Sequence, residues 1–332
     1  MIEHTYKSDL SKEILDFLML RKSSVTLKTY RQDCFNLALF DSFLYENKVS
    51  KNGITEEIIN AWISSFIGKY TNNTINIKIS SVRRFSEYLQ GNRILAFKPI
   101  LRKVRDDYIP YIFSDDEVKK IFENIDSIKV ITNQPDKDIY LKYPTLVRMI
   151  YGCGFRLGEV ISLKVKDLDL DLGTVRLRNT KNNKERLVPM HPSLTNILKN
   201  YCTLMGLQGK PEEWLFSSAD KSQHITERAV RSRFKTILTK AGISVAQRKF
   251  QERGPCLHCF RHLFAIKSFK KGETEGHPID SMVPVLSIYL GHSSLLGTEK
   301  YLKFNIPETF QESMELFYNF TDGFFPEVKY EE

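Results

Sequence analysis

The stretch GFRLGE, residues 154–159, places an arginine and a glutamate at the start of a predicted helix. An arginine in the first helical turn opposes the positive end of the helix dipole, so it is unfavourable there unless an anion also binds. Backbone N–H groups at a helix start are themselves suited to phosphate. We therefore predict a phosphate site that includes Arg156. A simple ion pair between Arg156 and Glu159 is the alternative.

A second polar segment, CLHCFRH, occupies residues 256–262. On a helix, His258, Arg261 and His262 share one face, which directs a proton-transfer group and an anion-binding group to the same place. A zinc site is the competing interpretation of the two cysteines. Structural zinc needs four ligands, and no second pair occurs at a usable spacing, so we predict no metal and treat Cys256 and Cys259 as small core residues.

The third segment, YLGHSS at residues 289–294, is followed by Tyr301, nine residues after His292. Tyrosines on amphipathic helices are usually packing residues, and this chain contains fifteen tyrosines. Taken alone, Tyr301 would be one more of them.

Apolar spacing elsewhere predicts a mainly helical chain with a small β-sheet. The first part, residues 1–91, is predicted as a small helical domain, and TNNT at 71–74 is predicted to cap its last helix. Residues 92–110 are basic and carry two prolines, which predicts an interdomain linker. Ser114 and Glu117 form a capping-box pattern at the start of the second domain. Alternation around Val175 and again from Leu187 predicts a β-hairpin inside this domain.

Composition excludes several classes of protein. The chain has 332 residues and 42% hydrophobic residues, enough for about two globular domains. Its apolar runs are shorter than the ~20 residues that span a bilayer, and the charged N-terminus resembles no secretory signal. The five cysteines form an odd set that suits a reducing compartment. We therefore predict a cytoplasmic protein without a membrane partner.

The positive charge of the chain is concentrated in one region. The formal net charge is +9, and residues 69–105 carry nine basic residues and one acidic residue, which leaves +1 for the rest. An excess of this size favours a polyanion, because cations near phosphates release condensed counterions. The alternative is a merely solvated basic stretch. The predicted DNA-binding residues are Lys69, Lys78, Arg83, Arg84, Arg93, Lys98, Arg102, Lys103 and Arg105.

The three polar segments, in this order, resemble the tyrosine recombinase (phage integrase) family. GFRLGEV resembles the family's first arginine box, LHCFRH its His-x-x-Arg box, and LGHSSLLGTEKY the closing box that ends in the nucleophilic tyrosine. Between them, TKNNKERLVPM resembles the family's hairpin. The resemblance implies a two-domain architecture, with a helical, SAM-like core-binding domain at 1–91 and a mixed α/β catalytic domain at 111–306. The stretch from 264 to 290 looks more like recombinases of transposons and other mobile elements.

Carried over to this sequence, the resemblance implies a site-specific DNA recombinase that needs no cofactor. Tyr301 would attack a DNA phosphodiester to form a 3′-phosphotyrosyl link, and strand exchange would pass through a Holliday junction. The resemblance assigns the remaining catalytic roles to Arg156, Lys181, His258, Arg261 and His292. Two arginines would hold the phosphate, Lys181 would protonate the leaving oxygen, and Glu159 would orient its neighbours.

Alternatives remain from the same resemblance. A type IB topoisomerase shares the chemistry but only relaxes DNA, and a non-catalytic DNA-binding regulator could share the fold. Residues 307–332 are predicted to hold one further helix and a tail. That helix either packs on its own domain or docks on a neighbouring protomer within a tetramer assembled on DNA.

Overall fold

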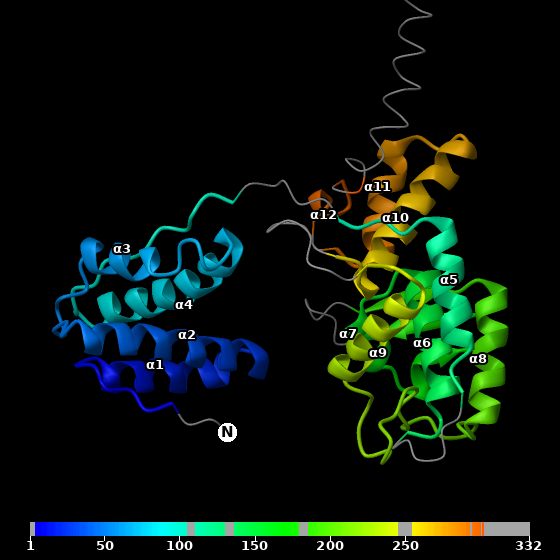
Figure 1. The fold of residues 1–332 in the computed structure, drawn as a ribbon, viewed down its shortest axis with the longest axis horizontal. Coiled ribbons are helices and arrows are strands. Elements are labelled where there is room, and N and C mark those ends of the chain that lie inside the picture. Colours follow the sequence, from blue (N-terminus) through cyan, green and yellow to red (C-terminus); the bar gives the residue numbers. More distant parts are fainter. Residues whose placement is uncertain are drawn as a thin grey trace, which may run out of the picture. The chain divides into compact units, whose positions relative to one another are not determined.

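The computed structural model describes residues 4–104, 110–129, 136–178, 185–244, 254–292, 294–299 and 301. The chain divides into two compact units, Met1–Tyr108 and Ile109–Glu332 (Figure 1). Within the described part of the chain, no helix is long and apolar enough to cross a membrane. The prediction of a mainly helical chain with a small sheet is confirmed.

The first unit consists of helices that enclose one apolar core. Its helices are α1 (Ser11–Ser24), α2 (Leu27–Glu46), α3 (Glu56–Ser64) and α4 (Asn72–Gly91). A threonine caps three of them, because the side chains of Thr26, Thr55 and Thr71 each accept a hydrogen bond from a backbone N–H three residues on. Such a cap stabilises a helix by roughly 1 kcal/mol relative to alanine. The TNNT prediction is therefore confirmed, with Thr71 as the cap.

The described part of the predicted linker packs on the first unit. The backbone N–H of Phe97 donates to the carbonyl of Ile54, at 2.7 Å, and Ala96 is buried in the core of that unit. Further along, the N–H of Arg102 donates to Asn76 Oδ1 at 2.8 Å. Residues 94–103 therefore belong to the first unit in the structure, although their sequence lacks any helical period that would predict packing.

The second unit holds the sheet and most of the helices. Its elements are α5 (Asp115–Asp126), α6 (Ile139–Cys153), α7 (Leu157–Ile161), η1 (Val165–Asp167), β1 (Leu168–Asp169), β2 (Thr174–Leu177), β3 (Arg186–Pro189), α8 (Pro192–Leu204), α9 (Glu227–Lys240), α10 (Leu257–Thr274), α11 (Ile279–Leu290) and α12 (Leu296–Glu299). The strands pair antiparallel in the order β1-β2-β3, with Val175 opposite Val188. The predicted hairpin and the Ser114–Glu117 capping box are confirmed.

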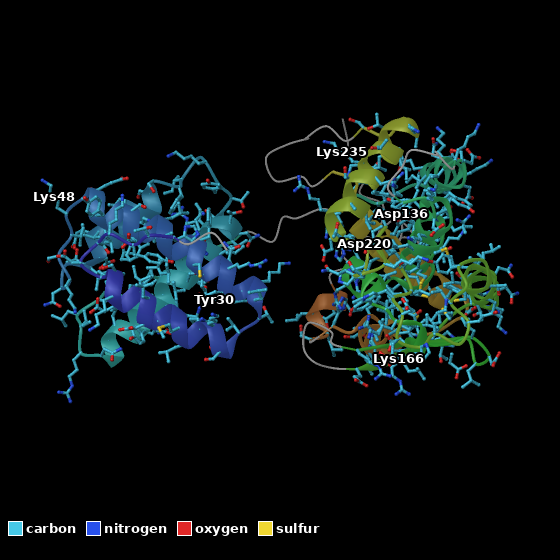
Figure 2. The ribbon with its side chains drawn as sticks, turned by 90° about the horizontal axis from the view of Figure 1, so that it is seen from below. Tyr30, Lys48, Asp136, Lys166, Asp220 and Lys235 are labelled. Atoms are coloured by element: carbon cyan, nitrogen blue, oxygen red, sulfur yellow. The ribbon has the colours of Figure 1, made fainter. Side chains whose placement is uncertain are left out.

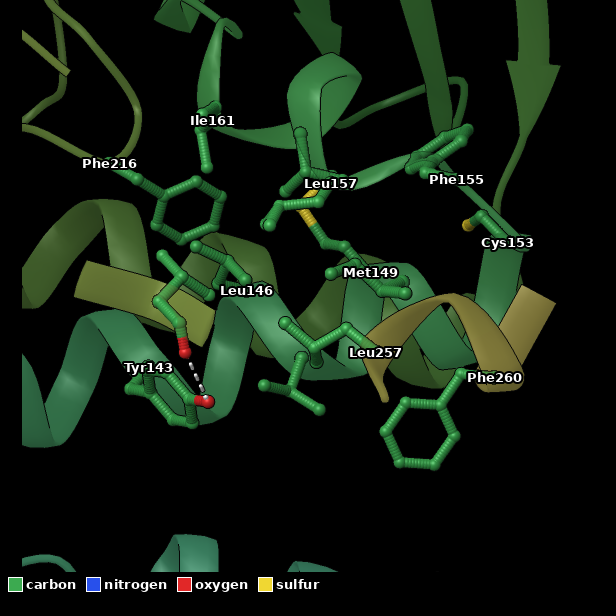
Figure 3. Packing of buried hydrophobic residues seen from close by; sticks show 14 of the residues in the cluster. Tyr143, Leu146, Met149, Cys153, Phe155, Leu157, Ile161, Phe216, Leu257 and Phe260 are labelled. Atoms are coloured by element: carbon green, nitrogen blue, oxygen red, sulfur yellow. Dashed lines mark hydrogen bonds between the residues drawn. The ribbon is translucent and has the colours of Figure 1, made fainter. Parts of the chain in front are cut away.

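Helices α6 and α10 pack together in the middle of the second unit. Phe260 of α10 is fully buried, and its ring lies 5.6 Å from that of Tyr151 in a T-shaped arrangement. Tyr143 is buried within α6 and donates its hydroxyl to the carbonyl of Val230 (Figure 3). Lys48 in the first unit and Lys166 in the second are exposed and lie outside these cores (Figure 2). This rigid packing fixes the helix faces that carry the polar site.

Candidate active site

Gly154 sets the direction in which the chain leaves α6 toward Arg156. Its φ of +62° is left-handed, and an added Cβ would lie 2.7 Å from Cδ1 of Phe264. Only glycine tolerates both conditions without strain. The chain can therefore turn tightly here and present Arg156 as the residue that precedes α7.

Glu159 binds two arginines at once. Its Oε1 accepts from Arg156 Nη1 at 2.8 Å and from Arg186 Nη1 at 3.1 Å. Its Oε2 accepts from Arg156 N at 2.9 Å and from Arg186 Nη2 at 3.0 Å. Burial raises the pKa of the carboxyl, but the bonds and charge of Arg186, with those of Arg156, outweigh it and lower the pKa. The Arg156–Glu159 ion pair considered as an alternative is therefore present, and it orients Arg156 within the site.

Arg186 is a site residue that the sequence did not single out. It begins β3, its side chain is only 9% exposed, and its Nε donates to the carbonyl of Tyr289 at 2.9 Å. An added Cβ at Gly291 would lie 2.5 Å from Arg186 Nη1, so the guanidinium occupies space that only a glycine leaves open. The sequence KERLVP at residues 184–189 marked the hairpin that contains Arg186. An arginine exposed on a surface strand would show the same pattern, so the sequence did not indicate that Arg186 belongs to the site.

Arg261 is the most deeply buried cation of the site, with 1% of its surface exposed. Its Nη1 donates to the carbonyl of Gly154, and its Nη2 donates to the carbonyl of Leu290, both at 2.7 Å. Burial, together with the charge of Arg156, lowers its pKa to about 10. The guanidinium therefore stays charged at neutral pH, and it joins the GFRLGE segment to the end of α11.

His292 lies between Arg261 and Thr298. Its Nε2 is 3.0 Å from Arg261 Nη2, and its Nδ1 is 2.7 Å from Thr298 Oγ1. Burial and the charges of Arg261, Arg156 and Arg186 lower the histidine pKa to about 4, so the ring is neutral near pH 7. Because an arginine can only donate, Nε2 accepts and the proton resides on Nδ1, directed at Thr298.

Tyr301 is buried next to the two histidine-bearing segments. It is 5% exposed, and its ring lies 6.1 Å from that of His292 and 5.4 Å from that of His262. Burial raises the phenol pKa, although Arg261 and Arg156 act in the opposite direction. The phenol is therefore protonated at neutral pH and needs a base before it can act as a nucleophile.

His258 and His262 both lie near the start of α10. The His258 ring lies on the exposed side, 4.6 Å from the ring of His262, and His262 in turn contacts Tyr301. Both belong to α10, one turn apart, so their common face is the predicted one. The ring of His262 lies beside that of Tyr301, and the role of His258 in proton transfer stays a prediction.

Lys181 and Arg105 lie outside the described residues, as do residues 307–332. Lys181 lies in the sequence between β2, which ends at Leu177, and β3, which begins at Arg186. Arg186 binds Glu159, so the hairpin that carries Lys181 is anchored to the site at one of its two strands.

The predicted DNA-binding cations differ in their exposure. Lys69, Arg93 and Lys103 are exposed, whereas Arg83, Arg84, Lys98 and Arg102 are half-buried. Some of their charge is neutralised internally, since Arg84 pairs with the buried Asp33 at 2.7 Å and Lys98 pairs with Glu87 at 2.6 Å.

Lys78 departs from the prediction. Its side chain is buried, with 6% exposed, and the ammonium lies 5.0–5.3 Å from the ring centres of Phe35, Phe66 and Tyr70. Burial lowers its pKa. A cation held over three rings has its charge satisfied by their π-faces, so Lys78 is not an exposed contact. Its position on the inner stripe of α4 explains the burial.

The prediction that Cys259 is a core residue is confirmed, while Cys256 is half-buried. Among the residues that the structure describes, no group of His, Cys, Asp and Glu side chains is arranged to hold a metal.

Four polar side chains, Arg156, Arg261, His292 and Tyr301, thus converge between α7, α10 and the end of α11. Comparisons with known proteins identify the family of the chain. The model of the phage integrase family matches residues 112–306. The chain belongs to the phage integrase family and is a tyrosine recombinase.

Named relatives extend the similarity over most of the chain. The tyrosine recombinase XerC of Staphylococcus carnosus is 26% identical over 285 residues, which cover 84% of this chain and 86% of XerC. The XerC of Staphylococcus aureus is 27% identical over the same shares. Among solved structures, the XerH site-specific recombinase bound to palindromic difH has a TM-score of 0.67 at 19% identity, covering 87% of this chain and 80% of that one. A lambda integrase dimer bound to a core site has a TM-score of 0.65 at 15% identity, with 88% and 76% covered. At these identities the two structures support the fold.

Proposed function

We propose that this recombinase cuts and rejoins DNA through a covalent bond between Tyr301 and a 3′-phosphate. The observation that carries the proposal is the cluster in which the Arg261 guanidinium contacts His292 at 3.0 Å while the ring of His292 stacks near that of Tyr301. The Tyr301 phenol, the neutral imidazole of His292 and the buried guanidinium of Arg261 therefore lie close together. That combination suits attack on a phosphodiester without a metal.

The proposed chemistry assigns one step to the Tyr301 phenol, one to the histidines of α10 and one to Lys181. The Tyr301 oxygen attacks the phosphorus, and the bond from phosphorus to the 5′-oxygen breaks. The phenol proton leaves toward the histidines of α10, where His262 is the ring in contact and His258 the more exposed neighbour. Lys181 supplies a proton to the departing 5′-oxygen, since an ammonium with a pKa near 10 readily protonates an alkoxide.

The arginines balance the charge that develops on the phosphate. Arg156 and Arg261 are held by protein acceptors before DNA arrives, so they need little rearrangement to bind the non-bridging oxygens. Glu159 and Arg186 do not touch the phosphate in this scheme. They fix the direction of Arg156 through four hydrogen bonds to the Glu159 carboxylate.

We propose exchange between two DNA duplexes rather than relaxation of one, in the manner of mobile-element integration or excision. The relatives that cover most of this chain are named recombinases, which favours exchange over the activity of a type IB topoisomerase. A regulator that has lost catalysis is disfavoured because Arg156, Arg261, His292 and Tyr301 are all present and clustered. We also propose that the protein acts on DNA in the cytoplasm.

A two-duplex assay tests this choice. A labelled duplex and an unlabelled one, each carrying the ends of the element that encodes the protein, are incubated with it, and supercoiled plasmid is assayed in parallel. We expect labelled recombinant strands and four-way junctions. Relaxed plasmid without any junction or recombinant product would instead indicate a topoisomerase, and products of neither kind would indicate a regulator.

Assembly into a tetramer on DNA would use an apolar surface beside the nucleophile. Val285, Ile288, Leu295 and Leu296 are 47–75% exposed on α11 and in the segment that follows it. We assign to this surface the segment 307–320 of a second copy, whose residues Phe310, Met314 and Phe317 recur at helical spacing. Such a contact would link the position of Tyr301 in one protomer to its neighbour.

Removing residues 307–332 is therefore expected to reduce cooperative assembly on DNA while leaving the unfolding midpoint of the protein nearly unchanged. Gel-shift titration of a two-site duplex measures the assembly. Ile288→Lys should reproduce the loss, whereas Leu172→Lys, at an equally exposed leucine elsewhere, should not. Unchanged cooperativity in the truncated protein would remove this contact from the proposal, and a large fall in the midpoint would indicate packing within one chain.

The salt dependence of binding should identify the exposed basic residues that contact DNA. Replacing Lys69, Arg93 and Lys103 by alanine is expected to reduce the slope of log binding constant against log salt by about 3, since each lost phosphate contact contributes roughly 0.9. A matched variant with Lys12, Lys22 and Lys28 replaced removes the same charge from exposed positions of the same unit. Equal slopes for the two triple variants would refute a contact surface confined to residues 69–105.

A further inference from the structure

The two thiols that begin α10 touch each other. Cys256 Sγ and Cys259 Sγ are 3.6 Å apart, and the backbone N–H of Cys256 donates to Cys259 Sγ at 3.4 Å. Cys256 is the residue that precedes α10, and Cys259 is in its first turn. Neither thiol has a role in the proposed strand cleavage, so their contact needs a separate explanation.

The two thiols differ in exposure and acidity. Cys256 is half-buried, while Cys259 is only 2% exposed. The hydrogen bond from the Cys259 thiol lowers the pKa of Cys256 to about 6, and the same bond raises the pKa of Cys259. The lowered pKa favours the thiolate, which is the reactive form, at the outer sulfur, while the inner one keeps its proton.

The other three cysteines lack this combination. Burial raises the pKa of Cys153 to about 12 and that of Cys202 to about 11, so both remain protonated. Burial also raises the pKa of Cys34. Oxidation should therefore be selective for the pair on α10, because reactivity follows thiolate character and access.

We propose that Cys256 and Cys259 form a reversible disulfide that is made by thiol–disulfide exchange with a low-molecular-weight disulfide. The Cys256 thiolate attacks one sulfur of that oxidant and releases the other as a thiolate. Cys259 then loses its proton, attacks Cys256 Sγ and releases the second thiolate. Two protein thiols are oxidised by two electrons, and one small disulfide is reduced to two thiols.

Closing the bond has a structural cost in the first turn of α10. A disulfide requires a sulfur–sulfur distance of about 2.05 Å, so the two atoms must approach by about 1.5 Å. His258 lies between the cysteines, and Arg261 follows within one turn. We therefore expect oxidation to shift the His258 end of the site. This consequence rests on the proposed DNA cleavage, whereas the disulfide itself does not.

Mass spectrometry tests the bond directly. Trypsin cleaves after Arg253 and Arg261, so the octapeptide GPCLHCFR, residues 254–261, carries both thiols and no other cysteine. The full-length protein is equilibrated with mixtures of oxidised and reduced glutathione, blocked with an alkylating agent and digested. We expect the octapeptide to become two hydrogens lighter and to escape alkylation, reversibly, while the peptides of Cys34, Cys153 and Cys202 stay alkylated. An octapeptide that remains alkylated, or that ends as a stable glutathione adduct on Cys256 with Cys259 still alkylated, would overturn the proposal.

Cleavage of nicked duplexes tests the consequence. Oxidation of the wild-type protein should slow adduct formation on the order of 10- to 100-fold, as expected for a displacement near 1 Å in an active site, with DNA binding retained. Under oxidising conditions, the Cys256→Ser protein should form adducts as fast as the wild-type protein does with its thiols reduced. The Cys34→Ser protein should still be slowed by oxidation. Equal inhibition of the Cys256→Ser protein would overturn the switch. If the reduced protein formed no adduct at all, the proposed function would fail, while the mass measurement would still decide the bond.

Discussion

Replacing Tyr301 by phenylalanine is expected to abolish the covalent attachment of the protein to DNA. The substitution removes only the phenol oxygen, the single atom that attacks phosphorus in the proposed reaction. Because the ring stays in its pocket against His262 and His292, DNA binding should change by less than about threefold, and the cost to stability should be of the order of one hydrogen bond, about 1 kcal/mol. Adducts on nicked duplexes, resolved on denaturing gels, give the measurement.

Tyr289→Phe is the matched control for this substitution. Tyr289 is half-buried near the site, and its ring stacks on that of Phe264 with 5.4 Å between the ring centres. Its hydroxyl donates to the carbonyl of Pro189 at 3.4 Å rather than facing Arg261. We expect normal adduct formation from this variant. Adducts that persist in Tyr301→Phe and disappear in Tyr289→Phe would transfer the role of nucleophile to Tyr289.

Replacing Arg261 by alanine should produce the second largest effect. The guanidinium satisfies the buried carbonyls of Gly154 and Leu290 and contacts His292, so the variant loses all three interactions. Each buried acceptor left unpaired costs roughly 1–3 kcal/mol, and loss of one charge-stabilising group in an active site typically slows the reaction by about 10²–10³-fold. We expect cleavage of bound DNA to fall at least this far while binding falls much less.

Protein stability must be measured beside this rate. Arg261→Lys keeps a positive charge but not the planar fork that reaches two carbonyls, so it should retain more stability than alanine and still cleave poorly. Arg231→Ala removes an exposed arginine of α9 that pairs with Glu227, and it should behave like the wild type. Arg261 variants that bind DNA much more weakly, yet cleave the bound DNA at the normal rate, would contradict the assignment of Arg261 to cleavage.

The local fold followed from short-range rules. Thr71, Ser114 and the alternation around Val175 specify caps and strands through neighbours within a few residues, so the sequence alone predicted them. The polar segments of the site were singled out by residue types that are unusual for packing, whereas the catalytic roles, that of Tyr301 included, came from the resemblance to the tyrosine recombinase family.

Contacts between distant segments could not be predicted from these patterns. Arg186 joins Glu159 and Tyr289, which are 27 and 103 residues away, and its letters would suit any exposed strand. The contact between the rings of His262 and Tyr301 likewise joins two segments that are separate in the sequence. For Lys78, the sequence predicted a DNA contact where the structure has a buried side chain. A count of charges along the chain does not show that a lysine on the inner face of α4 is buried against aromatic rings.

The most direct measurement isolates the covalent complex formed on a nicked duplex and identifies both partners of the new bond. Protease digestion and mass spectrometry locate the modified residue, and end-labelling identifies the DNA terminus. The account predicts that Tyr301 carries a 3′-phosphoryl strand and that the other strand ends in a free 5′-hydroxyl. A phosphate joined through its 5′ end, or a bond to any residue other than Tyr301, would contradict it.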